Sequence, residues 1–213
     1  MMLKLDHLTI IAPSLEAGAA HVRDQLGIDM PTGGKHPLMG THNLLLRLSN
    51  AVFLEVIAVD PTADRPDRPR WFGPDNADAV QSAWDDGRRL RGWVVQASDL
   101  DAVLAQHGPT LGRKTRLSRG DRTWLFAVPP DGSLPVDGIA PSAMDWEERG
   151  SPAPTMPEFG TSLLSFQIEH PDPGRVSKLY ARLGVVNPSE VRKGDQFCYR
   201  ALINTPTGVN ELN

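Results

Sequence analysis

Short apolar runs alternate with one amphipathic stretch along the first sixty residues. The runs Leu3–Ala12 and Val52–Val59 have the length and composition of buried strands. Between them, Leu15–Leu26 places apolar residues at helical spacing, with Ser14 as a plausible N-cap and Gly27 as a C-terminal glycine. The pattern therefore predicts a strand, then a helix, then further strands. Two of these are expected at Ile28–Gly34 and Asn43–Leu48.

The same order of elements recurs twice. A strand at Gly92–Ala97 precedes a helix at Leu100–His107, and Asp99 would cap this helix as Ser14 caps the first, 85 residues earlier. A third unit begins with a strand at Leu163–Glu169 and a helix within residues 174–183. The remaining strands are expected at Thr115–Ser118, Trp124–Val128, Leu134–Asp145, Ser189–Lys193 and Phe197–Asn204, before a closing GVNEL segment.

One such unit cannot bury both faces of its sheet, so the units must pair. We predict an α+β fold of one domain over residues 1–213, with modules at about 1–60, 90–146 and 161–213. Helices would cover the outer faces of the sheets, and the inner faces would enclose a cavity. The third unit, read as strand, helix and two strands, would be a partial repeat.

Two polar residues interrupt the apolar strands. His7 lies in the first strand and Glu55 in the run Val52–Val59. Because side chains alternate between the two faces of a strand, His7 would share the inner face with Thr9 and Ile11. An imidazole and a carboxylate on buried strands must be paired, bind a metal or face a wet cavity. They are therefore the first candidates for a functional site.

The third unit has a comparable polar row. Alternation places Leu164, Phe166 and Ile168 against its helix, and Gln167 with its polar neighbours on the opposite face. This row indicates a solvated cavity or a sheet edge.

Composition excludes several classes of function. The chain is 40% hydrophobic and 23% charged with a net charge of −4, so it has no basic surface for nucleic acid. The single cysteine, Cys198, rules out an intramolecular disulfide and a CxxC metal site. No apolar run approaches the roughly 20 residues of a membrane span, and no signal-peptide pattern opens the chain. We therefore expect a cytoplasmic protein that binds neither membrane nor nucleic acid.

Other polar and aromatic residues add to the candidate site. His36 lies in the segment GGKHPLMGTHN, which would form a rim beside the cavity, and its imidazole could act as a general acid or base. Asn43 follows this segment. Trp71 and Trp146 come from Pro-rich joints and either wall the pocket or pack the joints onto the barrel.

The segments LDHLTIIAPSLEAG, GGKHPLMGTHNLLLRL, FLEVIAVDP, MDW and GVNEL resemble the vicinal oxygen chelate superfamily, and most of all its glyoxalase-like domain group. This resemblance implies paired βαβββ modules that form a half-open barrel around a cavity. It also implies that His7 and Glu55 are metal ligands, with Glu211 in the closing segment as a further one. An imidazole with a carboxylate suits Fe, Mn, Ni or Zn, which would act as a Lewis acid.

The second module departs from the ligand pattern of the superfamily. The residue 85 positions after His7 is Gly92, which cannot bind a metal. Near the counterpart of Glu55, the only carboxylate is Asp145. A site without any metal therefore stays open as the alternative.

The resemblance implies an enzyme of the lyase, isomerase or dioxygenase type that acts on a small oxygenated organic molecule. We expect His36 and Glu55 to be catalytic and the substrate to contact Asn43, Gln167, Trp146 and Trp71. The alternative is a non-catalytic module that binds or sequesters a small molecule. A third interpretation is an interaction domain that uses an exposed sheet edge, and a homodimer stays open.

Overall fold

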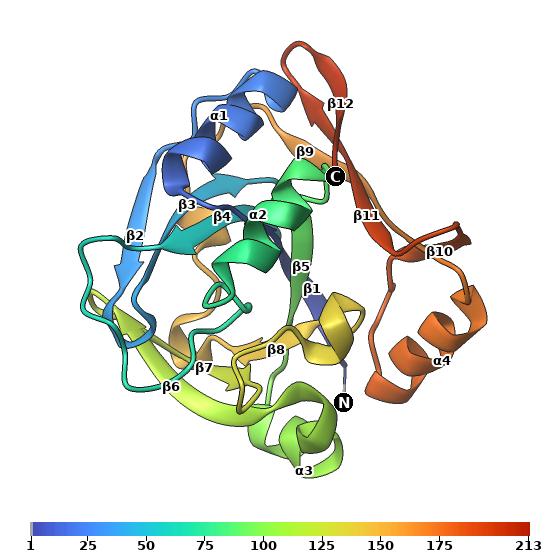
Figure 1. The fold of residues 1–213 in the computed structure, drawn as a ribbon. Coiled ribbons are helices and arrows are strands. Elements are labelled where there is room, and N and C mark those ends of the chain that lie inside the picture. Colours follow the sequence, from blue (N-terminus) through green and yellow to red (C-terminus); the bar gives the residue numbers. More distant parts are fainter. Residues whose placement is uncertain (1) are drawn as a thin grey trace.

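The computed structural model describes residues 2–213 (Figure 1). Its first module contains every element that the hydrophobic pattern predicted. These elements are β1 (Lys4–Ile11), α1 (Leu15–Leu26), β2 (Thr32–His36), β3 (Thr41–Arg47) and β4 (Phe53–Val59). The Ser14 hydroxyl accepts a hydrogen bond from the Ala17 amide, and Gly27 ends α1 in the left-handed conformation. Both predicted caps are confirmed.

The second module repeats this order. It consists of β5 (Leu90–Gln96), α3 (Leu100–Leu111), β6 (Arg113–Arg119), β7 (Arg122–Val128) and β8 (Ser142–Asp145). The Asp99 carboxylate caps α3 as predicted. The predicted strand Leu134–Asp145 is shorter, because a 3₁₀ turn occupies Pro135–Gly138.

The sequence prediction missed one helix, α2 (Ala77–Asp85), which lies between the two modules. Asn76 caps its first turn by accepting a hydrogen bond from the Ala79 amide. The helix buries only Val80 and Ala83, so its apolar stripe is short.

The two modules join into one eight-stranded sheet with the order β2-β3-β4-β1-β5-β8-β7-β6. In each module the first strand pairs in parallel with the fourth, and β1 pairs antiparallel with β5 where the modules meet. The outermost strands β2 and β6 approach each other, so the sheet curls into a nearly closed barrel. The predicted α+β barrel of paired βαβββ modules is therefore confirmed.

The strands bury different residues on their two faces. Leu8, Ile10 and Val56 belong to the outer core, which α1 and α3 cover from opposite ends of the barrel in Figure 1. Ile11 and Ile57 belong to a second core inside the barrel. This alternation places His7 and Glu55 on the inner face, as predicted.

The third unit contains β9 (Ser162–His170), α4 (Pro173–Leu183), β10 (Glu190–Lys193), β11 (Cys198–Thr205) and β12 (Gly208–Leu212). It therefore has a helix and four strands rather than the expected helix and three. Its sheet order is β10-β9-β11-β12, in which the first strand pairs in parallel with the second instead of the fourth. The interpretation as a partial repeat of the same module is corrected, because the third unit has a different topology.

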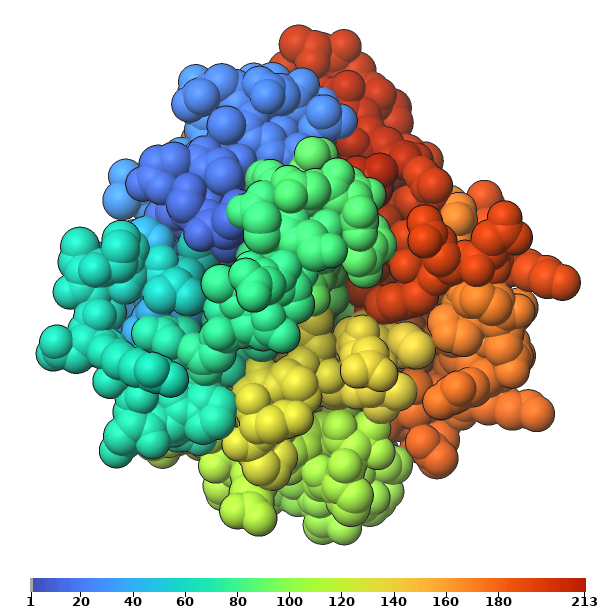
Figure 2. All heavy atoms as spheres, in the orientation of Figure 1, coloured from blue at the N-terminus to red at the C-terminus, as the bar shows by residue number. Residues whose placement is uncertain are grey.

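The third unit packs against the outside of the barrel. The Trp93 ring of β5 contacts Phe166 and Tyr180 in edge-to-face geometry, and Tyr199 donates a hydrogen bond to the Gly138 carbonyl. In the space-filling view the orange and red third unit lies along one side of the barrel (Figure 2). The unit thus extends the outer core and leaves the inner face of the barrel to the first two modules.

One predicted face of the third unit is wrong. Leu164 is 56% exposed, although alternation placed it against the helix. The pairing of β9 with β11 shifts between Leu202 and Ile203, so that Leu163 and Ser165 are paired and Leu164 is the extra residue. Such a bulge shifts the alternation by one residue, and Leu163 packs on the core instead.

Within residues 2–213 there is no helix with both the length and the apolar character that a membrane crossing requires.

Candidate active site

A bulge in β1 brings two polar side chains to the inner face. Leu5 pairs with Val95 and His7 with Val94, which leaves Asp6 as an extra residue in the strand. The His7 Nδ1 atom lies 2.7 Å from an Asp6 carboxylate oxygen, and the other Asp6 oxygen accepts a hydrogen bond from Trp146 Nε1 at 2.7 Å. Asp6 therefore fixes the orientation of the imidazole.

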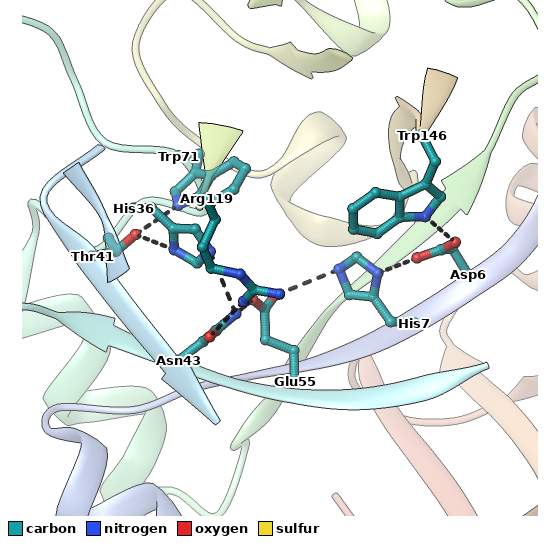
Figure 3. Close-up of polar contacts among 9 residues, drawn as sticks. All are labelled: Asp6, His7, His36, Thr41, Asn43, Glu55, Trp71, Arg119 and Trp146. Atoms are coloured by element: carbon teal, nitrogen blue, oxygen red, sulfur yellow. Dashed lines mark hydrogen bonds and ion pairs between the residues drawn. The ribbon is translucent and has the colours of Figure 1, made fainter. Parts of the chain in front are cut away.

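The second ring nitrogen of His7 faces Glu55. Its Nε2 atom lies 3.5 Å from a Glu55 carboxylate oxygen, and Figure 3 shows the two side chains pointing toward each other from adjacent strands. The imidazole also stacks on Phe53 with a ring separation of 4.5 Å. All four residues are buried, so Asp6, His7 and Glu55 form a chain of charged groups beside the Phe53 ring.

A second polar chain leads from Glu55 to the rim. Asn43 donates from Nδ2 to the other Glu55 oxygen at 2.7 Å and lies 3.4 Å from His36 Nε2. The Nδ1 atom of His36 and the indole nitrogen of Trp71 each lie 3.1 Å from the Thr41 hydroxyl. These contacts join β2, β3 and β4 around one carboxylate.

The charges of His7 and Glu55 stabilise each other. Burial alone would lower the pKa of His7, but hydrogen bonds and attraction from Asp6 and Glu55 outweigh it and raise that pKa to about 9. Burial would likewise raise the pKa of Glu55, yet the contacts with His7 and Asn43 and the nearby imidazoles lower it. The site therefore contains an imidazolium and a carboxylate at neutral pH.

His36 is in the opposite state. Burial lowers its pKa to about 4, although the Glu55 charge acts in the other direction. A neutral ring agrees with its hydrogen bonds, since Nδ1–H can donate to Thr41 while Nε2 accepts from Asn43. One cavity thus holds a protonated and a neutral histidine.

Aromatic side chains form the remaining walls of the cavity. They come from β4, from the joint after it and from the second module, and they are Phe53, Trp71, Phe72, Trp124, Phe126 and Trp146. Met144 and Leu45 complete the apolar lining, and Arg119 is the one cation apart from His7. The cavity volume is only about 20 Å³, because these side chains fill most of the space inside the barrel.

The side chains at this site do not complete a metal centre. His7 and Glu55 offer one nitrogen and one oxygen, whereas the second module lines the cavity with Arg119 and apolar side chains and adds no imidazole or carboxylate. Among residues 2–213 there is no group of three or more His, Cys, Asp or Glu side chains arranged to hold a metal ion. Since Arg119 adds a positive charge to the same cavity, we derive no metal-dependent step.

The structure brings most predicted site residues together and leaves some apart. His7, His36, Asn43, Glu55, Trp71 and Trp146 all line the cavity. Gln167 lies on β9 in the separate sheet, and exposed Glu211 pairs with Arg200 there. Asp145 accepts a hydrogen bond from the Glu147 amide and is not part of the lining.

Sequence reasoning missed three polar members of the site. The bulge in β1 brings Asp6 to the site, and the hydrogen bond from Trp71 involves Thr41. Arg119 reaches the site because β6 approaches β2. The only sequence signal for Asp6 was its place next to His7. Regular alternation, however, would have put the two side chains on opposite faces of the strand.

The family model of the glyoxalase-like domain matches residues 5–184. The chain therefore belongs to the glyoxalase-like domain family. The match ends at the C-cap of α4, before the last three strands of the third unit.

Several solved structures are similar to this chain to different degrees. A hypothetical protein from Staphylococcus aureus is similar over 100% of this chain and 99% of its own, with a TM-score of 0.65 and 14% identity. A methylmalonyl-CoA epimerase from Mycobacterium tuberculosis has a TM-score of 0.42 and 18% identity over 68% of this chain and 89% of its own. A Streptomyces coelicolor methylmalonyl-CoA epimerase, solved with 2-nitronate-propionyl-CoA, has a TM-score of 0.39 and 16% identity over 68% and 94%. No curated protein matches the chain.

Proposed function

We propose that this protein is an enzyme that moves a proton on a small oxygenated organic substrate, as an isomerase or a lyase does. The observation that carries this proposal is the buried pair of His7 and Glu55, whose facing atoms are 3.5 Å apart. An acid and a base held side by side in an apolar cavity are the parts that proton transfer needs. The family membership supports a site in the barrel cavity.

The two groups suit different halves of one reaction. Glu55 is ionised and can accept a proton from a carbon next to a carbonyl group. The His7 imidazolium can donate a hydrogen bond, and then a proton, to the carbonyl oxygen as negative charge develops there. Return of the proton to a different carbon completes an isomerisation, and loss of a neighbouring leaving group completes an elimination.

The surrounding residues hold this pair in place. Asp6 keeps His7 oriented and protonated, and Asn43 holds one oxygen of Glu55 so that the other faces the imidazole. His36 is neutral and bonded to Asn43, so it supports Glu55 through that amide. The aromatic walls would exclude water from the reacting atoms.

Exchange of carbon-bound hydrogen for solvent deuterium tests the proposal directly. We expect the wild-type protein to label a carbonyl compound in a panel of hydroxyaldehydes, ketones and 2-oxo acids, followed by NMR. Glu55→Gln keeps the shape of the side chain and removes the base, so exchange should fall by about 10²- to 10⁴-fold. Glu211→Gln is the matched control, because it changes an exposed glutamate outside the cavity. Equal exchange in wild type and Glu55→Gln would contradict the proposal.

The aromatic walls favour a second candidate, a non-catalytic module that binds a flat or apolar small molecule. Six aromatic side chains surround the cavity, and such walls provide affinity without chemistry. This candidate predicts that Glu55→Gln leaves ligand affinity unchanged and that wild-type protein catalyses no deuterium exchange into the bound compound. The same two proteins therefore separate the candidates.

A further inference from the structure

Arg119 reaches the active site from the far edge of the barrel. It is the last residue of β6, yet its side chain lines the cavity and approaches Asn43 and Glu55 in Figure 3. The side chain passes over Gly34 of β2, where a Cβ atom would lie 2.2 Å from Arg119 Cδ. The absence of a side chain at Gly34 is thus what lets the guanidinium enter.

The guanidinium has no anionic partner in this part of the molecule. None of the ion pairs among residues 2–213 includes Arg119, and its single hydrogen bond runs from a terminal nitrogen to the Asn43 amide oxygen at 3.2 Å. A guanidinium has five N–H donors, so most of its bonding capacity is unused. Burial lowers the pKa of Arg119, and attraction from Glu55 offsets only part of this effect because the two side chains form no ion pair.

The nearby carboxylates are committed to other groups. Asp6 binds His7 and Trp146, and Glu55 binds His7 and Asn43. Arg119 therefore supplies the cavity with a positive charge that Glu55 attracts at a distance but that no carboxylate binds directly.

We infer that Arg119 binds a carboxylate of the substrate, so that the protein acts on small carboxylic acids. A planar guanidinium matches a carboxylate with two parallel hydrogen bonds. This inference rests on the proposed function, which places the reacting atoms of the substrate at His7 and Glu55. The ligand class is then a 2-oxo or related oxygenated carboxylate with an apolar chain against the aromatic walls.

The test compares carboxylates with their uncharged methyl esters. The probes are 2-oxobutanoate, 3-methyl-2-oxobutanoate and phenylpyruvate, each beside its ester. Binding is followed by tryptophan fluorescence, since Trp71, Trp124 and Trp146 line the cavity. Wild type should bind at least one carboxylate about tenfold or more tightly than its ester.

Four variants locate the source of that preference. Arg119→Gln should abolish it, and Gly34→Ala should weaken it by displacing Arg119 while leaving the charge in the chain. The controls are Arg113→Gln, an exposed arginine on the same strand, and Gly108→Ala, where a Cβ meets nothing within 4 Å. Both controls should keep the preference. Circular dichroism checks that each variant folds. If Arg119→Gln does not fold, the carboxylate preference of Gly34→Ala tests the inference instead.

Two results would overturn the inference. One is equal binding of every carboxylate and its ester by wild type, and the other is a preference that survives in Arg119→Gln. Binding in Glu55→Gln separates this inference from the proposed function. A retained preference for carboxylates there, without deuterium exchange in any protein, would leave Arg119 as the anion site and reject only the proton transfer.

Discussion

The first two modules of the barrel share one strand order and differ in the side chains of their inner faces. The first module presents His7, Asn43 and Glu55 to the cavity, and Asp6 lies behind His7. At the corresponding face the second presents Phe126, Met144 and Trp146, and it adds a charge only through Arg119 at its edge. Duplicated topology thus supplies two walls, and only one of them carries an imidazole–carboxylate pair. The comparison teaches that a shared fold fixes where a site lies and leaves its chemistry to individual side chains.

The largest expected effect tests whether the second module is mainly a structural wall. Phe126 is 2% exposed and packs edge-on against Trp71 at 4.7 Å. Phe126→Ala should lower the free energy of unfolding by about 3–5 kcal/mol, because it leaves a cavity among aromatic rings.

Glu55→Gln is the comparison from the first module. It should cost only about 1–2 kcal/mol, since His7 keeps Asp6 as its ion-pair partner. Urea denaturation measures both variants. A larger loss in Glu55→Gln than in Phe126→Ala would mean that the first module carries the stability as well as the chemistry.

The charged pair of the first module should also make stability depend on pH. The pKa of His7 is raised from 6.5 to about 9 in the folded protein, so the folded state holds the proton more tightly than the unfolded state. The stabilisation is fully present below pH 6.5 and is lost as the pH rises through about 9. The loss is about 3 kcal/mol at most.

Denaturation curves between pH 6 and 10 measure this effect. His7→Gln should flatten the dependence over this range, and His107→Gln, which alters a histidine outside the cavity, should keep it. A wild-type stability that is flat between pH 6.5 and 9.5 would show that His7 is not held in the charged form.

Sequence periodicity predicted the elements and faces that depend on regular alternation. His7 and Glu55 are each flanked by apolar residues in a strand. Strand alternation with a period of two therefore placed both on the inner face. The caps at Ser14 and Asp99 were equally local signals.

Features that depend on pairing between strands were not predictable in this way. Bulges at Asp6 and Leu164 each add one residue to a strand, and nothing in the composition of either strand marks the position. The strand order of the third unit and the entry of Arg119 past Gly34 depend on contacts between segments far apart in the sequence. The pair of His7 and Glu55 was therefore predictable from the sequence, whereas the contact of Asp6 with His7 and the entry of Arg119 into the cavity were not.

A smaller effect should come from the bond that links the two modules. Trp146→Phe removes the N–H donor to Asp6 and leaves one oxygen of a fully buried carboxylate without that partner. The free energy of unfolding should fall by about 1–3 kcal/mol. Trp124→Phe is the control, because no hydrogen bond from its indole is found among residues 2–213, and its cost should be lower. Thermal or urea unfolding of the two variants would contradict the prediction if Trp124→Phe were the less stable.

The smallest effect is expected at Gly92, which lies 85 residues after His7. Its place in β5 corresponds to that of the histidine in β1, so the comparison of the modules is sharpest here. A Cβ atom at this position would lie 3.5 Å from both Thr9 and Leu134, which is ordinary van der Waals contact. Gly92→Ala should therefore raise the free energy of unfolding by about 0.5–1 kcal/mol, since glycine is unfavourable inside a strand.

The matched control for Gly92→Ala is Gly18→Ala in α1, where a Cβ would lie 2.2 Å from the Val56 side chain. That change should destabilise the protein, because the core must shift to admit a methyl group. Urea denaturation of both variants gives the sign of each effect. Destabilisation by Gly92→Ala would mean that the second module requires glycine at the position where the first module has His7. Stabilisation would mean that the glycine marks only the absence of a functional side chain, as the apolar inner face of the second module indicates.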